Sequence, residues 1–227
     1  MNSKSYLIIP LFFLLFGSIL TGKALSDDKL STVIEGLRSR YGNAKGWSAE
    51  YTREAVSKTM AILGAAERHD MATGRLYFEP PHFLRLEQAA PQEELLLTDG
   101  QTLWWYLPLK MEAYKYPAKK FGQELRLLSD VLKGLKDTKD KFQITLKANP
   151  ETNTYHLILK PEPPWQEIDH LELIIHKGDF SIKQVEVYNN IGGLTRFLLT
   201  DWKEKALFRN GFFSFSPPPN VKVIDNK

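Results

Sequence analysis

Residues 74–85 read GRLYFEPPHFLR and residues 95–108 read LLLTDGQTLWWYLP, and these two stretches decide the fold. Asp99-Gly100 lies between two apolar runs, which is a strong hairpin signal because both central residues of a type I′ turn need positive φ. We therefore predict a two-stranded hairpin over residues 95–108. Pro80-Pro81 cannot donate ladder hydrogen bonds, so one strand should end just before this pair and another should begin just after it. Together the two stretches predict four short strands in succession.

The chain on either side of these strands predicts two helices within a β-rich fold. Five apolar residues recur at helical spacing before the first strands, with Ser26 or Asp27 placed to cap that helix and Gly42 placed to stop it. They are Leu30, Val33, Ile34, Leu37 and Tyr41. Residues 121–135 repeat the helical pattern and predict a second amphipathic helix or a pair of short ones, whereas the remaining segments alternate with the period of two that is typical of strands. We expect around ten antiparallel strands in a strongly curved sheet or partial barrel, with the helices filling its mouth.

Residues 1–24 have the pattern of a signal peptide. Lys4 precedes an apolar run over residues 6–20, and the small residues around Lys23 end at Ala24, where we expect cleavage. The alternative is a transmembrane anchor, but the run is shorter than the ~20 residues that cross a bilayer. Residues 25–227 then form one domain, and the absence of cysteine excludes disulfides and a lipid-modified cysteine. We expect an exported, unanchored domain.

The charge balance argues against nucleic-acid binding. Removing residues 1–24 takes away Lys4 and Lys23, which leaves 28 basic residues against 27 acidic ones. A nucleic-acid binder needs a net basic face to neutralise phosphates. We expect no nucleic acid among the partners.

The strand that ends in proline, the Phe-Leu-Arg strand after it and the Thr-Asp-Gly hairpin that ends Leu-Trp-Trp-Tyr-Leu-Pro resemble the bacterial outer-membrane lipoprotein carrier family, the LolA-like proteins. The opening helix and the ending FSFSPP at residues 213–218, before the Val-rich residues 221–224, agree with that resemblance. It implies an unclosed antiparallel β-barrel with an N-terminal helix and a helical lid over its concave apolar face. It also implies a monomeric periplasmic carrier of lipoprotein acyl chains.

The same resemblance implies the partners of such a carrier. They are acylated lipoproteins, an inner-membrane ATP-driven complex that releases them, and an outer-membrane lipoprotein receptor. A sensor or interaction module of the same fold, which binds acylated ligands without transporting them, is the alternative function. A hydrolase acting in the cavity is a third possibility, and it lacks any spacing of nucleophile and base.

One position departs from the family pattern. Family members carry an arginine just before the proline that follows the Gly-x-Leu-aromatic strand, and this arginine is thought to hold the lid shut. The corresponding position here is Pro80, preceded by Glu79. A proline carries no charge and donates no hydrogen bond, so a different latch is required. Arg75 and Arg85 are the two candidates.

The predicted ligand site is a hydrophobic cavity lined by large apolar side chains. Three consecutive aromatic residues at 104–106 would point rings to both faces of a strand. Each such ring is either ordinary core or cavity lining, and both readings stay open. Our candidate cavity and lid residues are Trp47, Tyr51, Leu76, Phe78, Leu84, Trp104, Tyr106, Phe121, Leu125, Leu128 and Leu132.

The sequence contains no catalytic signature. The five histidines show no HExxH spacing, and without cysteine there is neither a thiolate nucleophile nor a mixed Cys/His metal site. We find no Gly-x-Ser-x-Gly elbow, and Gly192-Gly193 is typical of a turn between strands. We predict a binding protein with no cofactor, no metal and no enzymatic activity.

Overall fold

The computed structural model describes residues 21–56, 70–118, 123–135, 141–147, 152–205 and 207–226, with the side chains of residues 21–27 and 123–126 left out. These residues form a mainly β fold with two longer helices and one short 3-10 helix, η1 (Pro108–Lys110). The helices are α1 (Thr21–Tyr41) and α4 (Gln123–Leu132). The strands are β1 (Gly46–Val56), β2 (Asp70–Glu79), β3 (Phe83–Ala90), β4 (Glu94–Thr98), β5 (Thr102–Leu107), β6 (Glu112–Pro117), β7 (Phe142–Lys147), β8 (Thr154–Pro161), β9 (Ile168–His176), β10 (Ile182–Asn189), β11 (Leu194–Lys205) and β12 (Lys222–Asp225).

The described strands make one twelve-stranded sheet in the order β12-β6-β5-β4-β3-β2-β1-β11-β10-β9-β8-β7. Two meanders of sequence neighbours, β1 to β6 and β7 to β11, are joined where β1 pairs with β11. Every pairing is antiparallel except that of β12 with β6. Since β12 and β7 are the two edges and do not pair, the sheet is an unclosed barrel, as the sequence predicts.

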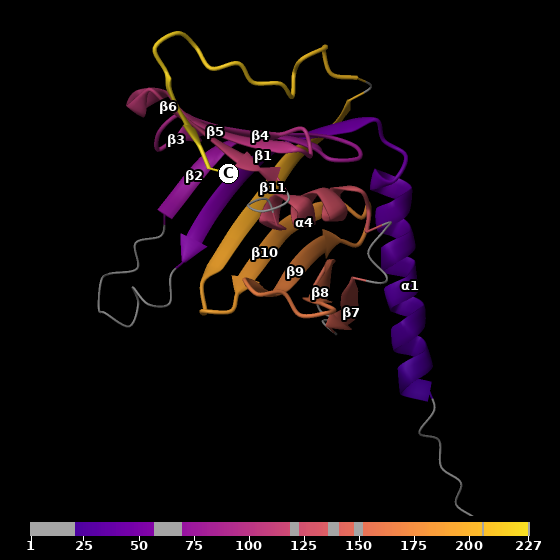
Figure 1. The fold of residues 1–227 in the computed structure, drawn as a ribbon. Helices are drawn as coiled ribbons and strands as arrows, with labels where there is room; N and C mark the ends of the chain where they lie inside the picture. Colours follow the sequence, from indigo (N-terminus) through magenta and orange to yellow (C-terminus); the bar gives the residue numbers. More distant parts are fainter. Residues whose placement is uncertain are drawn as a thin grey trace, which may run out of the picture.

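The sheet curves around α4, which lies in its hollow, while α1 stands at the side nearest β7 (Figure 1). Val33, Leu37 and Tyr41 of α1 are fully buried, and so are most described apolar residues of α4. They join the inward residues of β1–β3 and β7–β11 in one hydrophobic core. The apolar periodicity of both predicted helices therefore marks the faces that pack on the sheet.

The first helix starts earlier than its cap signal predicts. Ser26 and Asp27 lie inside α1, which begins at Thr21, so neither residue marks its start. The end is as predicted, because the Gly42 N–H donates to the Arg38 carbonyl at 2.8 Å just after the last helical residue. The predicted cleavage point after Ala24 falls within α1, and the rest of the predicted signal peptide lies in residues 1–20, outside the described chain.

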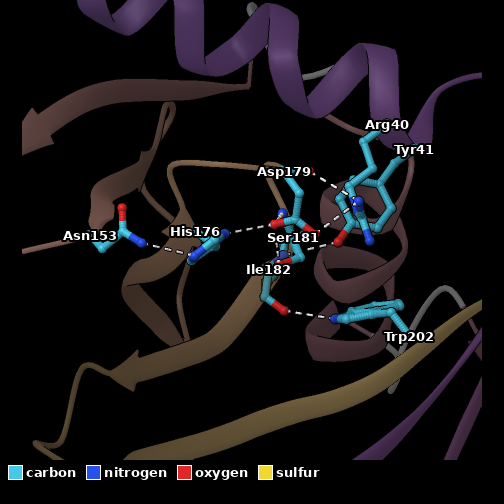
Figure 2. Close-up of polar contacts among 8 residues, drawn as sticks. All are labelled: Arg40, Tyr41, Asn153, His176, Asp179, Ser181, Ile182 and Trp202. Atoms are coloured by element: carbon cyan, nitrogen blue, oxygen red, sulfur yellow. Dashed lines mark hydrogen bonds and ion pairs between the residues drawn. The ribbon is translucent and has the colours of Figure 1, made fainter.

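The last turn of α1 is fastened to the β9–β10 turn by polar contacts (Figure 2). The Ile182 N–H donates to the buried Tyr41 hydroxyl at 2.9 Å, and Arg40 Nη1 lies 3.2 Å from Asp179 Oδ2. Trp202 Nε1 donates to the Ile182 carbonyl at 2.8 Å from the other side. These bonds fix α1 against the strands that carry much of the core.

The predicted hairpin over residues 95–108 is present as β4 and β5, but its turn is not type I′. Gly100 has a positive φ of +86°, whereas the φ of Asp99 is not positive. Asp99 Oδ1 instead accepts the N–H groups of Gln101 and Thr102, both at 2.8 Å. The aspartate side chain thus organises a longer loop, and only one residue needs positive φ.

The C-terminal segment, residues 207–226, crosses the outer surface of the sheet and ends with β12 beside β6 (Figure 1). Phe208 and Phe212 pack on Tyr77 of β2 with ring centroids 6.1 and 5.0 Å away, and Phe213 packs on Phe83 at 5.5 Å. The segment therefore covers aromatic side chains on the convex face of β2, β3 and β5.

Candidate functional site

A groove of about 440 Å³ opens on the concave face of the sheet. It lies over β1 to β5 and β11, with Glu167 contributed from the residue before β9. Its lining residues are Tyr51, Arg53, Ala55, Asp70, Leu86, Gln88, Glu94, Leu96, Leu103, Trp105, Glu167, Thr195 and Phe197. The volume falls within the ~300–1,000 Å³ typical of small-molecule sites.

Small residues on β1 and β2 help to leave this space open. On the concave face Arg53 faces Ala72 across the strand pair, and Tyr51 faces Gly74. A Cβ at Gly74 would overlap the backbone oxygen of Glu87, so the close approach of β2 to β3 keeps this position bare. Ala55, Ala72 and Gly74 therefore contribute almost no side-chain volume to the groove.

The apolar wall comes from a cross-strand row on the same face. Pairing aligns Leu76, Leu86, Leu96 and Trp105 across β2 to β5. Leu86, Leu96 and Trp105 line the groove, whereas Leu76 is fully buried in the core behind it. Phe197 closes the wall from β11, with its ring centroid 5.9 Å from that of Tyr51.

Polar groups interrupt this apolar lining. Trp105 Nε1 donates to Glu94 Oε2 at 3.0 Å, and Arg53 Nη2 lies 3.8 Å from Asp70 Oδ2. Burial raises the pKa of the Tyr51 hydroxyl to about 12, an effect that the Arg53 charge opposes and the Glu94 charge reinforces. Tyr51 is therefore neutral at physiological pH, and the groove combines apolar walls with a few fixed charges.

Most predicted cavity residues lie in the hydrophobic core and not in the groove. Tyr51 is the predicted residue that lines it. Six others are buried in the core under and around α4: Trp47, Leu76, Phe78, Leu84, Leu128 and Leu132. Phe121 lies outside the described residues, and Leu125 lies in α4 with its side chain undescribed.

Trp104 and Tyr106 point to the opposite, convex face. Register places Trp104 in the row of Tyr77, Arg85 and Leu97, and the two aromatic rings lie 5.3 and 5.2 Å from that of Phe215 in the C-terminal segment. The structure therefore does not bring these two predicted residues to the groove.

The two candidate latch arginines also face outward. Arg85 Nη1 donates to the Phe212 carbonyl at 3.0 Å, its guanidinium lies 4.9 Å from the Phe212 ring, and its Nε donates to Glu87 at 2.7 Å. Arg75 Nη2 lies 3.6 Å from Glu50 on the exposed surface. Both contact sets are on the convex face, away from α4, and Arg85 instead fastens the C-terminal segment.

Sequence reasoning missed most of the groove lining. Arg53, Leu86, Leu96, Leu103, Trp105 and Phe197 were not among the predicted site residues. The hairpin register could have found Trp105, because the strand pairing sets it beside Leu96 and away from Trp104. Period two along β1 would likewise have placed Arg53 with Tyr51.

Within the described ranges, no three His, Asp or Glu side chains are grouped so that they could hold a metal ion. His170 Nδ1 lies 2.6 Å from Asp169 Oδ2, and His176 Nδ1 lies 2.9 Å from Asp179 Oδ1. Neither α1 nor α4, as far as they are described, has the length and apolar character needed to span a membrane.

Comparison with known proteins gives a consistent result. The family model described as "Outer membrane lipoprotein carrier protein LolA" matches residues 47–216. An outer-membrane lipoprotein carrier protein of Pseudomonas paraeruginosa (strain DSM 24068 / PA7) is 25% identical to this chain over 206 residues, which cover 90% of this chain and 92% of the relative. A protein of the same name from Coxiella burnetii (strain RSA 331 / Henzerling II) is 25% identical over 231 residues, which cover 99% of each chain. The solved structure of an uncharacterized conserved protein from Thermus thermophilus has a TM-score of 0.53 at 14% identity and covers 87% of this chain and 99% of its own, which is a likeness of fold.

Proposed function

Because this chain belongs to the outer membrane lipoprotein carrier family, a family of non-enzymatic binding and transport proteins, we propose that it is a periplasmic carrier of acylated lipoproteins. In this proposal residues 1–24 direct export and are removed, and residues 25–227 act as one carrier domain. The domain takes acylated lipoproteins from an inner-membrane ATP-driven complex and delivers them to an outer-membrane receptor.

The groove on the concave face is the observation that supports this function. Its apolar lining consists of Leu86, Leu96, Leu103, Trp105 and Phe197. These side chains can contact an acyl chain, and contacts of this kind do not select one particular ligand. Acyl chains differ mainly in length, so the apolar part of this lining suits them. A catalytic site would need groups placed for bond making, and the family is non-enzymatic.

The size of the groove also suits a carrier that must release its ligand. Burying ten methylene groups gains about 8 kcal/mol, and association costs several kcal/mol of this. The remaining affinity protects a chain from water but does not exceed what a membrane offers to the two or three chains of a lipoprotein. Transfer to the acceptor then proceeds downhill, and the ATP-driven complex supplies the work of loading.

We further propose that α4 acts as the cover of a larger cavity. Leu128 and Leu132 are buried against the sheet, yet α4 is joined to the strands by apolar packing and not by a backbone ladder. Apolar contacts are non-directional, so acyl chains can replace the helix side chains one contact at a time. In this protein apolar packing would hold the helix closed in place of the family's lid arginine, because Arg75 and Arg85 contact other groups on the convex face.

The test is a release assay with the mature protein, an ATP-energised lipoprotein exporter and labelled lipoprotein in inner-membrane vesicles. The carrier function predicts a soluble complex of protein and lipoprotein that forms only with ATP and that donates its cargo to vesicles carrying the outer-membrane receptor. Ala55→Trp fills the groove wall and should reduce complex formation at least tenfold. Val56→Trp, the next residue, is the matched control and should leave it unchanged.

Three outcomes separate the alternatives. No soluble complex with the wild-type protein would contradict the carrier function. A stable complex that never donates its cargo would favour a sensor or interaction module of the same fold. Leu132→Glu puts a charge on the buried face of α4, and if uptake is unchanged in this variant, α4 is not the cover.

A further inference from the structure

Arg53 lies in the wall of the acyl groove with an unusual set of partners. Its Nε is buried and has no hydrogen-bond partner, and among the other described groups left in this state, Arg38 Nε, Arg40 Nε and Trp47 Nε1, none belongs to a groove residue. A buried donor without a partner costs about 1–3 kcal/mol, so each case needs a reason. A ligand acceptor would supply one.

Among the described residues, Arg53 has few interaction partners. Its ion pair with Asp70 is a 3.8 Å contact, and the Asp70 side chain is 66% exposed, so water strongly screens this interaction. The guanidinium carries five donors in a planar fork, and 32% of the Arg53 side chain is exposed. Ala72 on the facing strand and Ala55 two residues along bring no group that could compete for these donors.

The other charges of the groove decide what kind of acceptor fits. Among the residues that the structure describes, three carboxylates, those of Asp70, Glu94 and Glu167, line the groove together with one cationic side chain, that of Arg53. At neutral pH this described lining is therefore net negative, which disfavours an ionised carboxylate or phosphate on the ligand. A neutral carbonyl oxygen accepts hydrogen bonds from Arg53 without that repulsion.

We propose that Arg53 binds the neutral ester carbonyl at the head of an acyl chain, and so selects glycerol-esterified chains over free fatty acids. This inference rests on the proposed function, because it assumes that acyl chains occupy the groove. It names the chemical class of the ligand: an amphiphile whose chains are joined through uncharged esters. Arg53 fixes the depth at which the chain stops, since the carbonyl is held where apolar and polar lining meet.

The experiment measures binding of three probes with equal chain length to the exported and purified protein. The probes are 1-monopalmitoylglycerol, palmitate and hexadecane. Binding is measured by displacement of the neutral fluorophore diphenylhexatriene. We expect the wild-type protein to bind the glyceryl ester more tightly than palmitate at pH 7. Arg53→Gln should weaken the ester about tenfold and leave hexadecane unchanged, because one hydrogen bond to a charged donor contributes this much.

Two further variants keep the test sharp. Arg75→Gln changes an arginine of the neighbouring strand on the convex face and should alter none of the three affinities. Asp70→Asn removes the competing carboxylate at an exposed site that does not support the core, and it should tighten ester binding severalfold.

The possible failures have different meanings. If the wild-type protein binds none of the probes, the proposed acyl groove is wrong and this inference falls with it. If hexadecane binds but Arg53→Gln weakens all three probes equally, or none, Arg53 has only a structural role. If palmitate binds more tightly than the ester and is weakened more by Arg53→Gln, the site is for anions and the inference is overturned.

Discussion

Replacing Leu132 by alanine tests whether α4 is a cover or a permanent part of the core. The Leu132 side chain is 0% exposed and packs in the core cluster between the sheet and the helix. Removing a fully buried leucine side chain costs about 2–5 kcal/mol through lost transfer free energy and the cavity left behind. For a domain of this size the melting temperature should fall by roughly 4–20 °C.

The two interpretations differ in where this free energy appears. If α4 undocks while the sheet stays folded, Leu132→Ala lowers the free energy of undocking by the same 2–5 kcal/mol. The opening equilibrium of α4 then rises about 30-fold to several-thousand-fold. Amide exchange in residues 123–132 should accelerate by that factor, while exchange in β1 and β11 reports global unfolding alone. Acyl binding should tighten, because the helix competes less strongly for the hollow.

Hydrogen exchange read by mass spectrometry, beside urea unfolding followed by circular dichroism, measures both quantities. Leu95→Ala, which truncates a half-buried leucine on the convex side of β4, is the control and should leave α4 exchange unchanged apart from any global effect. Exchange in α4 that matches global unfolding in both wild type and Leu132→Ala would refute the cover, because the helix would then open only when the whole sheet does.

The remaining predictions concern the convex face, the α1 attachment and the groove wall. Arg85→Gln removes the hydrogen bond to the Phe212 carbonyl and the cation–π contact, which together stabilise the attachment of the C-terminal segment by about 1–3 kcal/mol. Protease cleavage within residues 207–226 should therefore increase, while the urea midpoint of the sheet stays near that of the wild type. Unchanged cleavage would contradict the proposed attachment by Arg85. Burial alone would raise the pKa of Asp179, but bonds from Ser181 and His176 and the Arg40 charge lower the pKa to about 2. Its carboxylate therefore adds stability above about pH 4, and this stability is lost as the pH falls through 2. Asp179→Asn should cost about 1 kcal/mol at pH 7, after discounting for the 49% exposure of this side chain, and clearly less at pH 2, where the carboxylate is about half protonated; urea titrations at the two pH values measure the difference. Gly74→Ala should lower the unfolding free energy by about 1–3 kcal/mol, because the new Cβ would overlap the β3 backbone. If the unfolding free energy falls no more than in Thr73→Ala, β2 and β3 can move apart at little cost and the close approach does not require glycine.

The strands and helices were predictable because local signals and the global fold agree. Alternation, the proline pair and the Asp99-Gly100 loop each mark a strand boundary that the structure confirms. The start of α1 was not predictable from Ser26 and Asp27, since a capping residue type also occurs inside helices when the chain before it continues the helix. Hairpin signals specify pairing, whereas turn type depends on which side chain bonds the loop backbone.

The site was harder to predict because both faces of β5 are apolar. Trp104 and Tyr106 are covered by Phe215, more than a hundred residues later in the chain, and Trp105 faces the groove. In a sheet with one solvent-exposed face, apolar and polar residues alternate, and this alternation identifies the inner face. Here both faces of β5 are apolar, because a segment distant in the sequence packs on the outer face. The groove also depends on what is missing at Ala55 and Gly74, and a search for large apolar residues passes over such positions.

The junction of β1 with β11 in the middle of the sheet has a consequence for how the protein folds. Each of the two meanders can form from neighbours in the sequence, but they meet only when Gly46 and its neighbours align with residues up to Lys205. Closing so long a loop is entropically costly and slow, so this pairing should be a late event in folding. Until it occurs, two unpaired strand edges are exposed and the groove between the halves does not exist. A newly made chain therefore passes through a stage that is prone to aggregation, and the groove forms only when folding is complete.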